Sequence, residues 1–213
     1  MLNDTDARSK LAVVVEPIAR GLLAIKMTPN TVTALGCLGV VVSAVYFIPQ
    51  GRFIPAVILV GIFMLTDMLD GTMARISGIT GPWGALFDSA MDRIADGVVF
   101  LGLTIWFVRT DQWGLVAAAS IVLIGSFVVS YTKARAESVG LATATGIAER
   151  TERLIIAAVV MVLSDLGVPY ILSVGMWILA ALVVITAWQR LRSAYLDAQA
   201  QQKAAQADES EAS

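Results

Sequence analysis

The sequence predicts an all-α integral membrane protein with six transmembrane helices and an N-terminal amphipathic interfacial helix. Of the 213 residues, 57% are hydrophobic and only 15% are charged, whereas soluble domains carry about 25% charged residues. Long uncharged runs also recur at residues 27–51, 112–132 and 166–189. Each run has the roughly 20 apolar residues that a helix needs to cross a bilayer.

The first expected element is an amphipathic juxtamembrane helix within residues 1–27, where apolar side chains recur at helical spacing on one face. This pattern is typical of a helix lying in the membrane interface, and also of a soluble helix packed beneath the bundle. Pro17 is expected to bend it. The apolar residues are Leu11, Val14, Val15, Ile18, Leu22 and Ile25.

The transmembrane domain is expected at residues 28–196, with Asn30 as a helix cap near its start. Besides the three uncharged runs, it has three apolar segments that carry charges near one end. Residues 197–213 are polar and lack aromatic side chains, which is typical of a disordered cytoplasmic tail. The three further segments are residues 53–75, 84–108 and 150–164.

Positive charge indicates how these helices are oriented. If they alternate from a cytoplasmic N-terminus, nearly all lysines and arginines fall on the inner side, and only Arg52 and Arg109 fall outside. Positively charged loops stay in the cytoplasm. We therefore expect a multi-pass protein with both termini in the cytoplasm.

Two pairs of aspartates interrupt the apolar pattern. Asp67 and Asp70 are three residues apart, and Asp88 and Asp92 are four apart, so each pair shares one face of its helix. Both pairs lie near the cytoplasmic ends of consecutive antiparallel helices. The four carboxylates are therefore expected to share one site at the membrane edge.

A divalent cation is the expected partner of these acids. Two unit charges about 4 Å apart repel by about 4 kcal/mol at an effective dielectric near 20, and Arg75 and Arg93 can offset only part of this. An oxygen-only site suits Mg²⁺ or Mn²⁺. Because the chain has no histidine and Cys37 is its only cysteine, a conventional zinc site is excluded. The alternative is that the aspartates form ion pairs between helices, which suits single acids better than four at matched spacing.

Small residues accompany the acids. Gly71, Ala74 and Gly84 would let a flat ligand approach the helix backbone, and Arg75 can bind a phosphate through its planar guanidinium. Taken alone, the two glycines could also serve helix packing. The full pattern is Asp67-x2-Asp70-Gly71-x2-Ala74-Arg75-x8-Gly84-x3-Asp88-x3-Asp92.

This pattern resembles the signature of the CDP-alcohol phosphotransferases at every signature position, and the resemblance covers about residues 5–195. It implies an enzyme of a bacterial cell membrane, commonly a homodimer, with its active site on the cytoplasmic side. Such an enzyme takes CDP-diacylglycerol and an alcohol and releases CMP. No nucleic-acid partner is expected.

The resemblance also implies the roles of the site residues. Asp67, Asp70, Asp88 and Asp92 would hold two Mg²⁺ or Mn²⁺ ions, and Asp92 would also act as the base. Asp96 lies outside the signature and is expected to form an ion pair, for example with Arg93, or to support the metal ligands. The residues expected to bind the CDP group are Asn30, Gly71, Ala74, Arg75 and Gly84.

Basic residues at the cytoplasmic ends of the last three helices favour an acceptor that carries a phosphate, although the positive-inside rule also explains them. The stretch Phe87–Gly97, "FDSAMDRIADG", is similar to inositol-transferring family members. "YTKARAES" and "ERTERL" are similar to bacterial members whose acceptor is inositol phosphate. The expected phosphate-binding residues are Lys133, Arg135, Arg153 and Arg192, with Arg150 as an alternative to Arg153.

The expected product is therefore phosphatidylinositol phosphate. Within the same family, glycerol phosphate or free inositol is the alternative acceptor. A cation transporter and a lipid-binding protein without turnover are alternatives of other classes. A transport site favours ionisable groups near mid-membrane and repeated helices, whereas these acids lie at one end of their helices.

Overall fold

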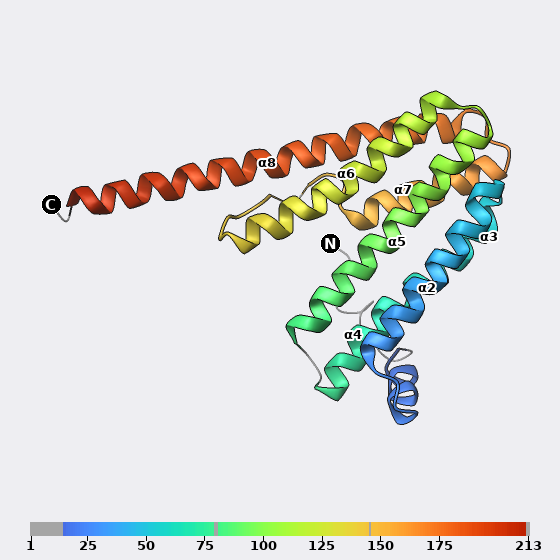
Figure 1. Cartoon of the computed structure of the whole chain (residues 1–213), viewed down its shortest axis with the longest axis horizontal. Coiled ribbons are helices and arrows are strands. Elements are labelled where there is room, and N and C mark those ends of the chain that lie inside the picture. Colours follow the sequence, from blue (N-terminus) through green and yellow to red (C-terminus); the bar gives the residue numbers. More distant parts are fainter. Residues whose placement is uncertain (1–14, 79–80, 145, 212–213) are drawn as a thin grey trace, which may run out of the picture. The chain divides into compact units, whose positions relative to one another are not determined.

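The computed structural model describes residues 15–211 apart from 79–80 and 145 (Figure 1). All regular secondary structure in these residues is helical, which confirms the predicted all-α class. The elements are α2 (Pro29–Phe47), the short 3₁₀ helix η1 (Ile48–Gln50), α3 (Phe53–Met64), α4 (Thr66–Ser77), α5 (Pro82–Arg109), α6 (Trp113–Ser138), α7 (Arg150–Asp165) and α8 (Ile171–Glu211).

Four segments of the described chain are long and apolar enough to cross a membrane, as expected for a membrane protein. The sequence predicts six spans, and the two further segments correspond to α5 and α7. The first half of α5 carries several charged residues, and α7 has only 16 residues. The four segments are Pro29–Gln50, Phe53–Ser77, Trp113–Ser138 and Ile171–Ala207.

The described chain divides into two compact units with a boundary between Val99 and Phe100. In the first unit, residues 15–24 are helical, and Ala19 forms a small core with Val32 and Met73. Ala19 and Leu22 thus pack against α2 and α4, whereas Ile18 and Ile25 of the predicted apolar face are exposed. The earlier part of the predicted amphipathic helix, residues 1–14, lies outside the described residues.

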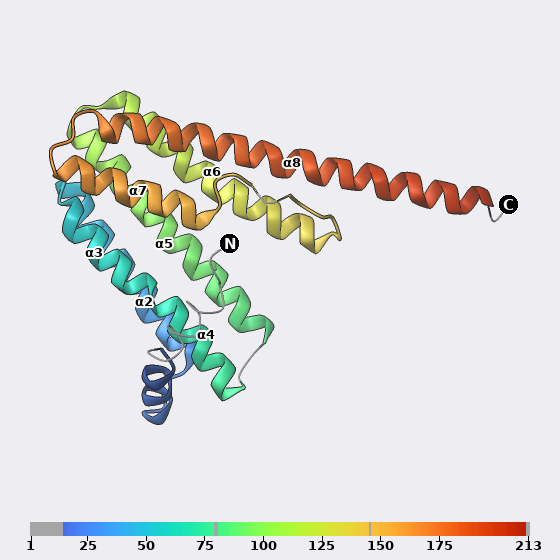
Figure 2. The same ribbon diagram turned by 180° about the vertical axis from the view of Figure 1, so that it is seen from behind.

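Helix α2 runs beside α3 and α4 (Figure 1 and Figure 2). The predicted continuous span 53–75 is interrupted at Leu65, so that α4 begins immediately before the aspartate pattern. Two glycines of α2 face this interruption. A Cβ atom on Gly36 would lie 1.8 Å from Thr66 Oγ1, and one on Gly39 would lie 2.3 Å from the ring of Phe63. Glycine is therefore required for α2 to pack this closely.

The start of α2 differs from the prediction that Asn30 is its cap. The N-cap is Thr28, whose hydroxyl accepts a hydrogen bond from the Thr31 N–H at 3.2 Å. Pro29 follows as the first helical residue, where its fixed φ and missing N–H are favourable. Asn30 thus lies within the first turn.

In the second unit, α8 packs against both α6 and α7 (Figure 2). Close contacts again involve glycine, since a Cβ atom on Gly125 would lie 2.8 Å from Val183. The predicted disordered tail differs from the structure, in which α8 continues to Glu211. Alanine and glutamine dominate this segment, and both are strong helix formers.

Candidate functional site

The first aspartate pair lies on α4, directly after the interruption at Leu65. Asp70 is only 7% exposed and accepts a hydrogen bond of 2.5 Å from the hydroxyl of Thr33 on α2. A buried carboxylate is costly unless it is hydrogen-bonded. Thr33 therefore stabilises and orients Asp70, a role that the sequence analysis missed because nothing in the spacing links the two residues.

The second pair, Asp88 and Asp92, lies on α5 within the same unit. The charges of Asp88 and Asp67 act on Asp70. Those of Asp67 and Asp92 act on Cys37 of α2, whose thiol donates to the Met91 carbonyl at 3.5 Å. The fold thus brings the predicted carboxylates of two helices within electrostatic reach around one face of α2.

The donor chemistry of this cluster fits a hard divalent cation, because aspartates supply only oxygen ligands. Across the part of the chain that the structure describes, no three acidic, histidine or cysteine side chains lie close enough together to hold a metal ion. The carboxylates would therefore have to draw closer on binding one. The positive charge of the cation would then offset the mutual repulsion of Asp67, Asp70 and Asp88, which their approach would otherwise increase.

The residues expected to bind CDP lie around the same acids. A Cβ atom on Gly71 would meet no atom within 4 Å, so the backbone of α4 is open there. Arg75 is exposed and donates through Nε to the Gly71 carbonyl at 3.2 Å. A Cβ atom on Gly84 would lie 3.7 Å from Asn30 Oδ1. The first turns of α2 and α5 thus bring these last two residues together, while Ala74 is half-buried on α4.

Asp96 is 5% exposed and lies in the interior. Arg93 forms an ion pair with Asp92, at 3.6 Å between Nη2 and Oδ2. Arg93 therefore contacts the predicted base itself, and its suggested pairing with Asp96 stays a prediction.

The predicted acceptor-phosphate residues all belong to the second unit. Lys133 and Arg135 at the end of α6 and Arg192 on α8 are exposed, and Arg150 is half-buried. Arg153 is only 1% exposed, and its Nη1 donates to the Ala148 carbonyl at 2.8 Å. The three exposed cations can meet a soluble anion directly, whereas Arg153 stabilises the start of α7.

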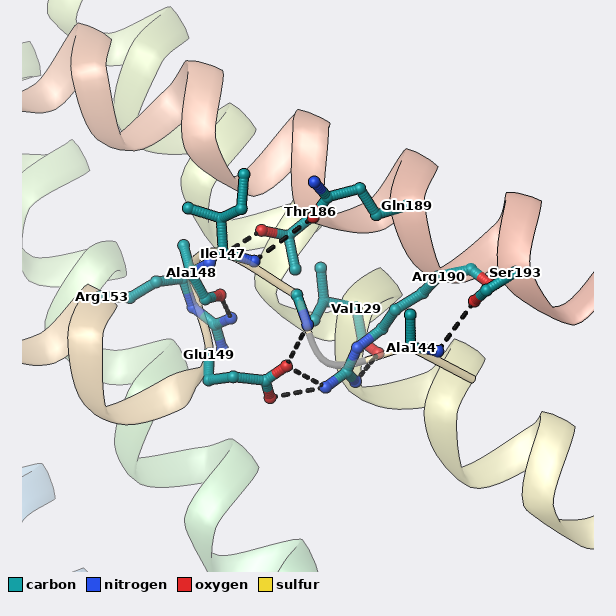
Figure 3. A network of polar contacts seen from close by, with 11 residues as sticks. Val129, Ala144, Ile147, Ala148, Glu149, Arg153, Thr186, Gln189, Arg190 and Ser193 are labelled. Carbon is teal, nitrogen blue, oxygen red and sulfur yellow. Dashed lines mark hydrogen bonds and ion pairs between the residues drawn. The ribbon is translucent and has the colours of Figure 1, made fainter. Parts of the chain in front are cut away.

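An ion pair between the buried Arg190 and the partly exposed Glu149 lies beside Arg153 (Figure 3), and it was not predicted. Arg190 is 3% exposed, and its Nη2 lies 2.6 Å and 2.5 Å from the two carboxylate oxygens of Glu149. Its Nη1 donates to the Val129 carbonyl at 2.8 Å. Burial raises the pKa of Glu149, but the Gly146 N–H and the Arg190 guanidinium outweigh it and hold that pKa below its usual value. No sequence pattern connects Glu149 and Arg190.

Comparison with known proteins identifies the family. The sequence profile described as CDP-alcohol phosphatidyltransferase matches residues 26–188, most of the chain. The chain belongs to this family. As a CDP-alcohol phosphatidyltransferase it is a phosphotransferase, and the family resemblance carried by the aspartate pattern is confirmed.

Individual relatives within the family are similar over most of their length. The phosphatidylinositol phosphate synthase of Corynebacterium glutamicum is 41% identical over 186 residues, which cover 86% of this chain and 85% of the relative. The crystal structure of the Mycobacterium tuberculosis phosphatidylinositol phosphate synthase with CDP-DAG bound is 44% identical. It has a TM-score of 0.83 and covers 86% of this chain and 94% of the other. The crystal structure of the same enzyme in complex with manganese and citrate is 45% identical and has a TM-score of 0.82. It covers 85% of this chain and 88% of the other.

Proposed function

We propose that this enzyme transfers the phosphatidyl group of CDP-diacylglycerol to inositol phosphate, giving phosphatidylinositol phosphate and CMP. The observation that carries the proposal is the similarity, over more than four-fifths of both chains, to enzymes named phosphatidylinositol phosphate synthase. The sequence features that favour an inositol phosphate acceptor point in the same direction.

The first unit would bind the nucleotide lipid. Asp67, Asp70, Asp88 and Asp92 would hold two divalent cations, which would neutralise the diphosphate and the charge that develops during transfer. The hydrogen bond from Thr33 would keep Asp70 oriented toward that task. Support for a divalent metal comes from the oxygen-only donor set and from the manganese complex of the M. tuberculosis enzyme.

Asp92 would act as the general base, because the chain has no histidine and a carboxylate is the available proton acceptor. The acceptor hydroxyl would give its proton to Asp92 while its oxygen bonds to the phosphorus that carries diacylglycerol. The bond from that phosphorus to the bridging oxygen of the diphosphate would break, and CMP would leave with that oxygen.

The second unit would bind the phosphate of the acceptor. Lys133, Arg135 and Arg192 are exposed cations, and guanidinium and ammonium groups are the usual protein partners of phosphate. Arg150 supports this group better than Arg153, because Arg150 is partly exposed and Arg153 is buried.

We further propose that α5 and α7 also cross the membrane, for a total of six spans with an interfacial helix before them. Both termini and the active site would then face the cytoplasm of a bacterial cell, in line with the distribution of positive charge. The enzyme is proposed to be a homodimer, as the family resemblance implies.

Turnover assays with three different acceptor alcohols distinguish this function from its alternatives within the family. Purified enzyme is incubated with CDP-diacylglycerol, Mg²⁺ and radiolabelled inositol phosphate, free inositol or glycerol phosphate in parallel, and labelled lipid and CMP are measured. We expect turnover with inositol phosphate and little with the other two. Turnover of glycerol phosphate without turnover of inositol phosphate would reject the proposed acceptor, whereas no CMP release with any of the three would reject the enzyme class.

Gly71 and Gly36 provide a matched pair of glycine-to-alanine variants. Gly71→Ala is expected to raise the KM for CDP-diacylglycerol, because a methyl group would obstruct ligand approach, without loss of thermal stability, because that space is empty. Alanine in place of a mid-helix glycine even favours the helix by about 1 kcal/mol. Gly36→Ala is expected to lower the unfolding temperature in detergent, because its Cβ would clash with Thr66. An unchanged KM in Gly71→Ala would contradict the proposed CDP contact.

A further inference from the structure

An irregular segment between α6 and α7 runs along α8 and is hydrogen-bonded to it. This segment, called the strap here, comprises residues 139–148 apart from 145, which the structure does not describe. Its backbone N–H groups need partners, and side chains of α8 bind four of them. The hydrogen bonds join Ala142 to Asp197 Oδ2 at 2.9 Å, Ala144 to Ser193 Oγ at 2.9 Å, Ile147 to Gln189 Oε1 at 3.3 Å and Ala148 to Thr186 Oγ1 at 3.0 Å.

The acceptors on α8 are spaced at three or four residues, so they lie on one face of the helix, one in each turn. From Thr186 to Asp197 this face extends about 16 Å at a rise of 1.5 Å per residue. Gly146 lets the strap approach, since a Cβ atom there would lie 2.2 Å from Thr186 Cγ2. The position of the strap is therefore set by the side chains of α8.

Glu149 ends this arrangement and joins three elements (Figure 3). Its carboxylate accepts the Gly146 N–H of the strap at 2.8 Å and binds the buried guanidinium of Arg190 on α8. It also immediately precedes Arg150, the first residue of α7. The ion pair thus holds the end of the strap and the start of α7 against α8.

The surroundings of Glu149 contain two of the cations assigned to the acceptor. Arg150 follows it directly, and the charge of Lys133 acts on its carboxylate. Glu149 carries the same sign as a phosphate and is already bound by Arg190. It is therefore suited to hold the cations in place and unsuited to contact the acceptor.

We propose that Glu149, anchored by Arg190, is a positioning residue that sets the affinity for the phosphorylated acceptor. This inference rests on the proposed function of the second unit. Through the strap and the first turn of α7, Glu149 would fix where Lys133 and Arg150 present their charges. Its removal would therefore affect the acceptor more than the nucleotide lipid.

The test compares Glu149→Gln with Glu152→Gln in the full-length enzyme. Glu152 lies in the first turn of the same helix but is exposed, so it controls for the loss of a negative charge. We expect Glu149→Gln to raise the KM for the acceptor about tenfold or more, equivalent to about 1.4 kcal/mol, with an unchanged KM for CDP-diacylglycerol. Glu152→Gln should leave both values unchanged, and Glu149→Asp should restore part of the acceptor affinity.

Two outcomes would overturn the inference. One is an acceptor KM in Glu149→Gln equal to that of Glu152→Gln. The other is a parallel loss of kcat, of both affinities and of thermal stability, which would indicate a merely structural ion pair. If Glu149→Gln does not fold, Glu149→Asp and Ser193→Ala carry the test, because Ser193 holds the strap from the partly exposed surface of α8. An unchanged acceptor KM in both would then reject the proposal.

The acceptor in these assays is whichever alcohol the unmodified enzyme turns over. Failure of the inositol phosphate assignment is thereby separated from failure of the role proposed for Glu149.

Discussion

Replacing Asp92 with asparagine is expected to abolish CMP formation while leaving a folded protein that can be recovered in detergent. Asparagine keeps the size of the side chain but cannot take a proton, and general-base catalysis contributes about 10²–10⁴-fold to rates. The loss of a metal-binding oxygen would add to the effect. CMP release is measured from CDP-diacylglycerol and inositol phosphate at saturating Mg²⁺, and folding is followed by thermal unfolding.

Asp111→Asn is the matched control for this substitution. Asp111 is exposed in the turn between α5 and α6 with a φ of 55°, a conformation that asparagine tolerates well. The control should retain full activity. If Asp92→Asn turns over substrate at a rate close to that of the control, Asp92 is neither the base nor an essential metal ligand.

Removal of divalent cations is the second change with a large expected effect. Treatment with EDTA should reduce CMP formation to background, and addition of Mg²⁺ or Mn²⁺ in excess should restore it. The physical reason is that the acids and the diphosphate all carry negative charge, and the nearby arginines offset only part of it. Undiminished turnover in the presence of EDTA would contradict a metal-dependent mechanism.

Metal binding can also be measured without turnover. In the presence of CDP, Mn²⁺ is expected to raise the unfolding temperature of the enzyme, because a ligand that binds only the folded state stabilises it. Asp67→Asn should weaken this rise, whereas Asp111→Asn should keep it. An equal rise in all three proteins would mean that the cation binds elsewhere.

The aspartate pattern and the small residues beside it were predictable because their chemistry is local. Spacings of three and four residues place carboxylates on one helix face whatever the remaining structure does, and four acids in an apolar chain require a positive partner. The partners of these acids on α2 were not predictable in this way. Thr33 reaches Asp70 across 37 residues, and only the packing of α2 beside α4 brings them together.

The residues predicted to bind the acceptor phosphate show a similar limit of prediction from sequence. Their number and charge are visible in the sequence, but their exposure is not. Arg153 and Arg190 both look like cytoplasmic surface cations, yet the structure buries them beside Ala148 and Glu149. Whether an arginine meets a ligand or a neighbouring carbonyl depends on contacts between helices that are far apart in the chain.

The helix boundaries that differed from prediction have local and tertiary causes. Pro29 is the first helical residue of α2, so the cap is Thr28, a residue type that is favourable at this position. Strong helix formers extend α8 through the predicted tail. The interruption at Leu65 is different, because α2 packs closely there through Gly36 and Gly39.

By itself, the amino-acid sequence determined that this protein is a helical membrane enzyme of the CDP-alcohol family with an acidic cluster on two consecutive helices. Composition and short-range spacing suffice for that, since both act within a few turns of helix. The tertiary structure alone decided which side chains hold the acids and which cations are buried. It also decided that Glu149 joins the strap to α8. These features depend on segments about 40 residues apart that meet only after the helices have packed.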